Sequence, residues 1–173
     1  MPNHCGTVAI VGRPNVGKST LLNRILGQKL VITSHKAQTT RHAVVGIKTG
    51  EGGQMVFVDT PGIHQRGDSA LNRYLNRAAR AAVADVDLAL FVVEALRWTD
   101  EDAKALAAVA EAGVTAIAVV NKVDTVKDKT RLLPYLQELA ARHPFREVVP
   151  VSAAGGGQVE GLERVILAAL PEG

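Results

Sequence analysis

The stretch that decides the fold of this chain is Gly12-Arg13-Pro14-Asn15-Val16-Gly17-Lys18-Ser19. It fits the pattern G-x-x-x-x-G-K-[ST] at every fixed position. An apolar run at residues 7–11 precedes it, where we expect a buried strand, and residues 18–26 follow with the pattern of a helix that ends before Gly27. Strand, glycine-containing turn and helix in this order are typical of a loop that binds the phosphates of a nucleoside triphosphate.

The residue types of this loop suit phosphate chemistry. Glycines allow the backbone to curve so that its N–H groups face phosphate oxygens, and the positive end of the helix dipole points to the same place. Lys18 adds a full charge near the β- and γ-phosphates, and Ser19 offers a hydroxyl to Mg²⁺. The pattern leaves ATP and GTP both open. We predict phosphate contacts from the whole loop and the next residue: Gly12, Arg13, Pro14, Asn15, Val16, Gly17, Lys18, Ser19 and Thr20.

Strand and helix patterns alternate along the chain around this loop. The 173 residues fit one domain, residues 1–173, and the hydrophobic content of 47% is enough for a core. We predict an α/β fold with a six-stranded, mostly parallel sheet, one antiparallel strand and five helices. The antiparallel pair follows from a link too short to hold a crossover helix. Strands are expected at residues 7–11, 43–48, 55–58, 88–93, 115–120 and 148–151, and helices at 18–26, 68–83, 101–112, 127–142 and 159–170.

Composition and charge exclude several classes of protein. The net charge is +3 and no block of five or six like charges occurs, so we expect an ordinary solvated basic surface. No apolar run reaches the roughly 18 residues that span a membrane, and the N-terminus lacks the pattern of a secretion signal. The single cysteine, Cys5, can form no internal disulfide, so we expect a reducing, cytoplasmic location.

Some conspicuous residues have ordinary interpretations. The five histidines show no metal-ligand spacing, so we expect them to face solvent. We interpret Trp98 as a packing or loop-contact residue, because nothing in the surrounding sequence suggests a cofactor cage. Arg13 and Arg41 are near the predicted phosphate site, and we expect surface charges there rather than catalytic groups.

A second motif selects the base. Asn121-Lys122-Val123-Asp124 follows the strand expected at 115–120, at the sheet edge where open α/β sheets bind ligands. A carboxylate at Asp124 accepts two hydrogen bonds from the N1–H and the exocyclic amine of guanine, whereas adenine would leave it unpaired. We expect the Lys122 stem across the purine, Asn121 tying the loop to its neighbours, and backbone N–H groups of Ser152, Ala153 and Ala154 near the guanine O6.

A third group of residues suits a γ-phosphate sensor. Asp59-Thr60-Pro61-Gly62 follows another strand, and we predict phosphate contacts from all four residues. Asp59 would hold Mg²⁺ through water, and the Gly62 N–H would contact the γ-phosphate. Thr39 and Thr40 both offer a second hydroxyl to the metal, and we favour Thr40. The predicted Mg²⁺ ligands are Ser19, Thr40 and Asp59.

The order of these motifs resembles that of the translation-factor-related P-loop GTPases, and within them the Era-like family. The resemblance extends over essentially the whole chain. Its most specific part is Lys36-Ala37-Gln38-Thr39-Thr40-Arg41; Thr20-Leu21-Leu22-Asn23, Ile63-His64 and Arg97-Trp98-Thr99 also match. It implies a three-layer Ras-like fold and GTP and GDP as ligands. Members carry a C-terminal KH domain, which is not present in this chain, and bind 16S rRNA of the 30S subunit. The resemblance leaves open a peripheral association with the inner membrane.

The resemblance also bears on catalysis. Ras-like enzymes place a glutamine directly after the glycine of DxxG, and this chain has Ile63 there, as Era-like proteins do. We therefore expect slow GTP hydrolysis that depends on Asn15, Lys18, Thr40 and Gly62, with Mg²⁺ as cofactor. Related GTPases with asparagine at the Asn15 position use K⁺, which we expect here too. Two alternatives stay open: a nucleotide-dependent binding module with negligible turnover, and an ATPase.

Overall fold

The sheet in the computed structural model has the predicted six strands in the order β2-β3-β1-β4-β5-β6. The model describes residues 4–13, 16–27, 44–50, 52–58, 83–155 and 158–172. Among the described strands, β2 and β3 pair antiparallel and the other neighbours pair parallel, which confirms the prediction. The strands are β1 (His4–Val11), β2 (Val44–Gly50), β3 (Gly53–Val58), β4 (Leu88–Glu94), β5 (Ala116–Asn121) and β6 (Glu147–Pro150).

Strands β4 and β5, which follow β1 in the sheet order, are almost entirely apolar. In β4 every residue except Glu94 is buried, and β5 is buried throughout. Continuous apolar strands are typical of a parallel sheet that is covered on both faces. The polar residues Glu94 and Asn121 stand at the carboxyl ends of these strands, where parallel sheets place their ligand sites.

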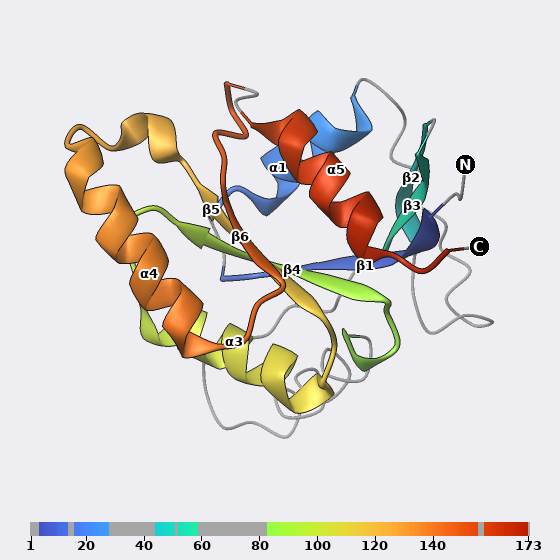
Figure 1. Ribbon diagram of the computed structural model, residues 1–173, viewed down its shortest axis with the longest axis horizontal. Helices are drawn as coiled ribbons and strands as arrows, with labels where there is room; N and C mark the ends of the chain where they lie inside the picture. Colours follow the sequence, from blue (N-terminus) through green and yellow to red (C-terminus); the bar gives the residue numbers. More distant parts are fainter. Residues whose placement is uncertain are drawn as a thin grey trace.

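Helices cover both faces of this sheet, as Figure 1 shows. They are α1 (Lys18–Leu26), α3 (Asp100–Ala112), α4 (Leu132–Arg142) and α5 (Val159–Ala169). One core cluster contains Leu21 of α1 and Leu162 of α5, and the other contains Val109 of α3 and Leu139 of α4. The result is the expected three-layer arrangement.

Several predicted boundaries needed correction. β1 begins at His4 rather than residue 7, because its first residues pair with β3 from Gly53 onward. The predicted start of the helix at 127–142 is wrong. A 3-10 turn at Lys129–Arg131 comes first, and α4 begins at Leu132. Pro134 therefore lies in the first turn, where its missing N–H has no intrahelical partner to lose, and does not kink the helix.

The predicted helix count is tested only in part. Four of the five expected α-helices are present among the described residues. The fifth, expected at 68–83, falls outside the described ranges except for Val83. In the described part of the chain, no helix combines the length and the apolar character needed to cross a membrane.

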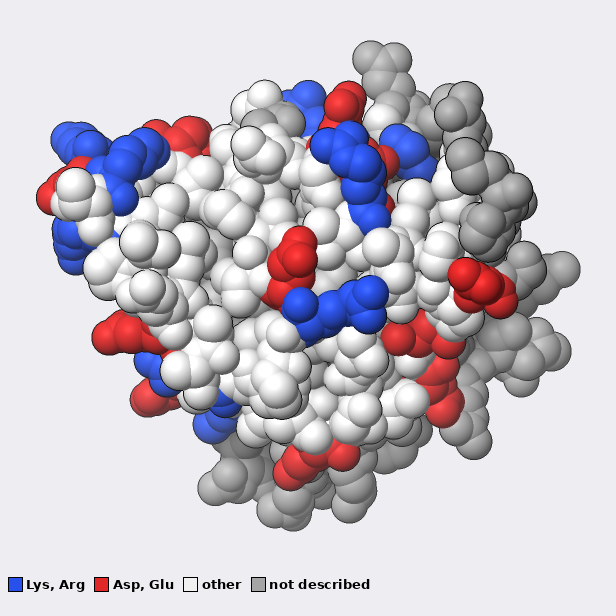
Figure 2. All heavy atoms as spheres, in the orientation of Figure 1, with Lys and Arg blue, Asp and Glu red and all other residues white. Residues whose placement is uncertain are grey.

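Charged side chains of both signs are interspersed over the face shown in Figure 2. Basic side chains gather at the corner near the start of α4, and others lie near the top and at the centre of the view. Lys127, Lys129 and Arg131, which come just before α4 in the chain, are exposed. Acidic side chains lie beside this group. The view agrees with an ordinary solvated surface on this side of the molecule.

Candidate functional site

The site is built at the carboxyl ends of four neighbouring parallel strands. Gly12 follows β1, Glu94 ends β4, Asn121 ends β5 and Ser152 comes shortly after β6. Residues from the first and second sequence motifs are thereby brought to one edge of the sheet. This edge is the usual ligand position in open α/β folds.

The phosphate loop turns sharply into α1 at Gly17. Gly17 has φ of 95° and precedes the helix without any side-chain cap. A Cβ on Gly17 would lie 2.2 Å from the Asn121 Nδ2 atom, and one on Gly12 would lie 2.6 Å from the Val92 carbonyl oxygen. Both positions therefore require glycine. The uncapped N-terminus of α1 keeps its first backbone N–H groups directed at the loop, an arrangement that suits an anion.

Lys18 stands at the first position of α1. Its Nζ atom donates to the Gly12 carbonyl oxygen at 2.5 Å, so the ammonium folds back over the loop. The Val16 side chain of the loop is fully buried. Ser19 is exposed in the first helical turn, and its hydroxyl oxygen is the hard ligand that Mg²⁺ prefers.

Asn121 connects the three loops of the site. Its side chain is buried, and its Nδ2 atom donates to the Val16 carbonyl oxygen at 2.9 Å. Its Oδ1 atom accepts from the Ala153 backbone N–H, also at 2.9 Å. The predicted tie between the base-reading loop and its neighbours is confirmed, and a single amide fixes the spacing of all three loops.

Lys122 and Asp124 lie in the turn after Asn121. Lys122 has φ of 65° and leads into a 3-10 turn at Val123–Thr125. The Thr125 hydroxyl donates to the Lys122 carbonyl oxygen at 2.7 Å, and Lys129 Nζ donates to the Val123 carbonyl oxygen at 2.6 Å. These bonds hold the turn. Asp124 is exposed on it, so its carboxylate is accessible for pairing with a ligand.

Arg24 supports the loop that contains Ser152, a role that the sequence motifs did not reveal. Arg24 lies on α1, and its Nε atom donates to the Ala153 carbonyl oxygen at 3.1 Å. Its Nη2 atom donates to the Ala154 carbonyl oxygen at 2.6 Å. With these carbonyls held by arginine, the loop has a fixed orientation. No local sequence signal identifies Arg24, because its partners lie about 130 residues away.

A charged network occupies the end of β4. Arg13 was expected to be a surface charge, and this was wrong: its side chain is 13% exposed and bonds to the fully buried Asp102 carboxylate at 3.2 Å. Its Nη2 atom also lies 3.6 Å from Glu94 Oε1. Glu94 pairs in addition with Lys122 at 3.3 Å and with Arg97 at 2.7 Å. One carboxylate therefore faces three cationic side chains.

Asp102 holds the beginning of α3 as well as Arg13. Its Oδ2 atom accepts from the Thr99 backbone N–H at 2.8 Å, and its own backbone N–H donates to the Thr99 hydroxyl oxygen at 3.3 Å, so the two residues form a capping box. The Thr99 hydroxyl also donates to Oδ2 at 3.0 Å. The other carboxylate oxygen, Oδ1, is buried without a hydrogen-bond partner. The interaction of Asp102 with Arg13 thus links the first turn of α3 to the phosphate loop.

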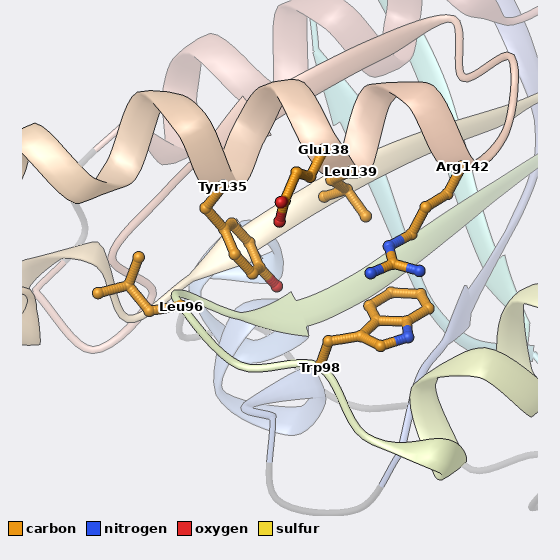
Figure 3. A pocket seen from close by; sticks show the side chains of 6 residues that line it. All are labelled: Leu96, Trp98, Tyr135, Glu138, Leu139 and Arg142. Atoms are coloured by element: carbon orange, nitrogen blue, oxygen red, sulfur yellow. The ribbon is translucent and has the colours of Figure 1, made fainter.

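A shallow pocket of about 140 Å³ lies between α4 and the loop after β4. Figure 3 shows Arg142 over the Trp98 ring, with its guanidinium carbon 4.0 Å from the ring centre. Trp98 also packs edge-on against Phe91, which confirms a packing role. The Tyr135 hydroxyl is shared between the carbonyl oxygens of Arg97, at 2.6 Å, and Glu94, at 3.1 Å. Burial, more than the nearby Asp102 charge, raises the pKa of Tyr135 well above its ordinary value.

Several predicted site residues lie outside the described part of the chain. They are Pro14, Asn15, Thr39, Thr40, Arg41, Asp59, Thr60, Pro61, Gly62 and Ile63. Of the three expected Mg²⁺ ligands, only Ser19 is described. Within the described ranges, no group of three or more His, Cys, Asp or Glu side chains is placed to bind a metal.

Comparison with known proteins agrees with this geometry. A family described as 50S ribosome-binding GTPase matches residues 7–122. GTPase Era of Pseudomonas putida is 56% identical over 171 residues, which are 99% of this chain and 57% of that protein. The chain thus spans little more than half the length of the curated relatives that it matches.

Two solved structures of Era are similar in three dimensions. Era of Aquifex aeolicus, a variant bound to GDP and AlF4⁻, is 37% identical with a TM-score of 0.78, and the match covers 98% of this chain and 58% of that one. A second Era structure, in complex with MgGDPNP and nucleotides 1506–1542 of 16S ribosomal RNA, is 38% identical with a TM-score of 0.81. That match covers 99% of this chain and 58% of the other.

Proposed function

The chain belongs to the family of 50S ribosome-binding GTPases, and from this we propose that it binds GTP with Mg²⁺ and hydrolyses it slowly as a molecular switch. The observation that carries the proposal is the Asn121 amide, which joins the Val16 and Ala153 backbones at 2.9 Å each. Through these two bonds, side-chain contacts within the protein itself hold the phosphate loop and the base-reading loops in one arrangement. Such preorganisation reduces the entropy cost of binding.

Guanine specificity is the first property to test. Asp124→Asn should weaken GDP binding and shift the preference toward xanthine nucleotides, because the amide cannot accept both guanine hydrogen bonds. Asp128→Asn is the matched control, since Asp128 is exposed nearby and its side chain bonds to Thr130 instead. Displacement of a fluorescent GDP by GTP, ATP and XTP measures the preference. If ATP displaces GDP as well as GTP does, the chain is an ATPase-type nucleotide binder and our assignment fails.

Hydrolysis is assigned to the phosphate loop and the residues around it. Lys18 would stabilise charge on the transferring phosphate, Ser19 would bind Mg²⁺, and Asn15, Thr40, Asp59 and Gly62 would complete the site. When bound, Mg²⁺ would act as a Lewis acid on the phosphate oxygens. The MgGDPNP in the solved Era structure supports Mg²⁺ as the metal. For K⁺, the support is the asparagine at position 15.

Single-turnover phosphate release separates the switch enzyme from its alternative. We expect release in K⁺ buffer that is faster than in Na⁺ buffer and that stops when Mg²⁺ is chelated. Equal rates in both salts would exclude a role for K⁺ but leave the GTPase. No release in either salt would favour a binding module with negligible turnover, which the apolar Ile63 after the DxxG glycine supports.

The partners of the whole protein are a further part of the proposal. The Era complex with 16S ribosomal RNA supports a role with the small subunit, although the family's description names the 50S subunit. The role in 30S assembly and 16S rRNA maturation is therefore proposed for a longer protein with an RNA-binding domain. Binding of a 16S rRNA 3′ fragment by this chain, with and without GTP, tests how much of the interaction this domain supplies. Cytoplasmic location and peripheral membrane contact both stay predictions. Sedimentation of the chain with lipid vesicles can check the membrane contact.

A further inference from the structure

Glu94 stands between the two halves of the nucleotide site. It ends β4 and is the one residue of that strand that is not buried. Its Oε1 atom lies 3.3 Å from Lys122 Nζ in the base-reading loop and 3.6 Å from Arg13 Nη2 in the phosphate loop. Its Oε2 atom lies 2.7 Å from Arg97 Nε, outside the site. The same carboxylate oxygen thus contacts one cation from each half.

The surroundings make the contact between Glu94 and Arg13 stronger than an ordinary surface ion pair. The side chains of Glu94 and Arg13 are 19% and 13% exposed, that of Lys122 is 38% exposed, and Asp102, which holds Arg13 from the other side, is not exposed at all. Charges that are partly withdrawn from water interact through a lower effective dielectric and are screened less by salt. Arg97, by contrast, is 68% exposed, so its pair with Glu94 should contribute little.

We propose that Glu94 is a positioning residue that couples the phosphate loop to the base-reading loop through Arg13 and Lys122. The proposal rests on the proposed function and adds a regulation of that site. Anchored at Nζ, the Lys122 stem is held in one direction, in which its methylene groups can cover a purine. Arg13, fixed by two carboxylates, sets the path of the backbone that binds phosphate. When one of these two cations moves, its attraction to the Glu94 carboxylate changes. The carboxylate then shifts, and the position of the other cation shifts with it.

Two binding measurements distinguish coupling from simple structural support. The first is the dissociation constant of GDP. The second is the ratio of the dissociation constants of GMP and GDP, which measures what the phosphate loop contributes through the β-phosphate. Both are obtained by displacement of a fluorescent GDP from the purified chain. A residue that only stabilises the fold would lower the melting temperature without changing the GMP-to-GDP ratio.

Glu94→Gln keeps the shape of the side chain and removes its charge. We expect it to raise the Kd of GDP about fivefold, at the lower end of typical coupling between sites, and to lower the GMP-to-GDP ratio about twofold. Lys122→Met keeps an apolar stem and removes the ammonium group. It should lower the same ratio, although Lys122 is predicted to touch only the base. In the Lys122→Met background, Glu94→Gln should add less than its effect in the wild type.

Arg97→Ala is the matched control. It removes the shortest ion pair of Glu94 while leaving Arg13 and Lys122 in place, so GDP affinity and the GMP-to-GDP ratio should both stay at the wild-type values. Unchanged GDP binding by a folded Glu94→Gln variant overturns the inference. So do fully additive effects of the two substitutions with an unchanged ratio.

The remaining outcomes are also decisive. If Glu94→Gln does not fold, Lys122→Met alone tests the coupling, and an unchanged GMP-to-GDP ratio in that variant overturns it. If the wild-type chain binds no guanine nucleotide, the proposed function fails and takes this inference with it. A wild type that binds GDP while the ratio fails to respond to either substitution refutes only the coupling.

Discussion

Asn121 and Val16 are 105 residues apart in the chain, and a 2.9 Å hydrogen bond joins the side-chain amide of the first to the carbonyl oxygen of the second. Because the Oδ1 atom of Asn121 accepts from the Ala153 N–H, the orientation of the amide is determined from both sides. Asparagine carries its donor and its acceptor on two separate atoms of one short side chain, so it can bond to both loops at once. The residue therefore has a structural role that is separate from contact with a ligand.

Asn121→Asp tests this role. The carboxylate still accepts from Ala153 but faces the Val16 carbonyl oxygen without a donor, so we expect a loss of about 1–3 kcal/mol in the free energy of unfolding. Urea unfolding of the nucleotide-free chain measures it. Asn23→Asp is the control, because Asn23 is exposed on α1 and should change stability by less than about 0.5 kcal/mol. Equal stability of both variants would show that the bridge does not hold the loops.

Alanine substitutions at Gly17 and Gly113 distinguish the free-energy cost of a left-handed backbone from the cost of a steric clash. Gly17 and Gly113 both have positive φ, 95° and 68°, but a Cβ would meet Asn121 at the first position and open space at the second. Gly113→Ala should cost about 1–2 kcal/mol for the left-handed backbone alone. Gly17→Ala should cost about 2–5 kcal/mol, because the steric conflict is added, and should abolish tight GDP binding. Similar unfolding curves for the two variants would contradict the close approach.

The sequence predicted the sheet well because its signals are local or set by chain topology. A short apolar run such as β4 is typical of a strand that is covered on both faces of a parallel sheet, and a short link between β2 and β3 permits only an antiparallel pair. The residues Lys18, Asn121 and Asp124 could be predicted as site residues because fixed spacing in a motif is typical of a fixed geometry around a ligand.

The supporting residues could not be predicted in the same way. Arg24, Glu94 and Asp102 act through partners that come close only after folding, and each is an ordinary charged residue in its own segment. The expectation for Arg13 failed for the same reason, since its two carboxylate partners lie on β4 and α3. The start of α4 was misplaced because residues 127–131 have helical propensity, whereas the Asp128 side chain bonds to the Thr130 N–H at 3.0 Å and favours a tight turn.

The Arg13–Asp102 pair predicts a large stability effect at a residue outside every nucleotide motif. Asp102→Ala removes the capping box of α3 and the carboxylate that neutralises Arg13 in a poorly hydrated position. We expect the free energy of unfolding to fall by about 3–5 kcal/mol. Asp100→Ala, in the same helical turn but exposed, should cost less than about 1 kcal/mol. Urea titrations of both variants decide, and a small effect at Asp102 would mean that water solvates the pair.

Tyr135 predicts how stability changes in alkaline solution. Because burial raises its pKa above the ordinary value of about 10, the folded state keeps the phenol proton at a pH where the unfolded state has released it. Unfolding is then accompanied by proton loss, so this contribution to stability is complete below pH about 10 and falls as the pH rises toward the folded-state pKa. Other groups titrate in this range too, and Tyr135→Phe isolates the share of this one.

At pH 7, Tyr135→Phe should cost about 1 kcal/mol, because the hydroxyl no longer bonds to the carbonyl oxygens of Glu94 and Arg97. At pH 10.5 the difference in free energy of unfolding between the two proteins should shrink. Only the wild type loses stability there, because its folded state must keep a proton on residue 135. Thermal or urea unfolding at both pH values measures this double difference. A gap that stays constant or widens with pH would mean that the phenol is open to water, and the linkage between α4 and the end of β4 would then be weaker than the hydrogen bonds indicate.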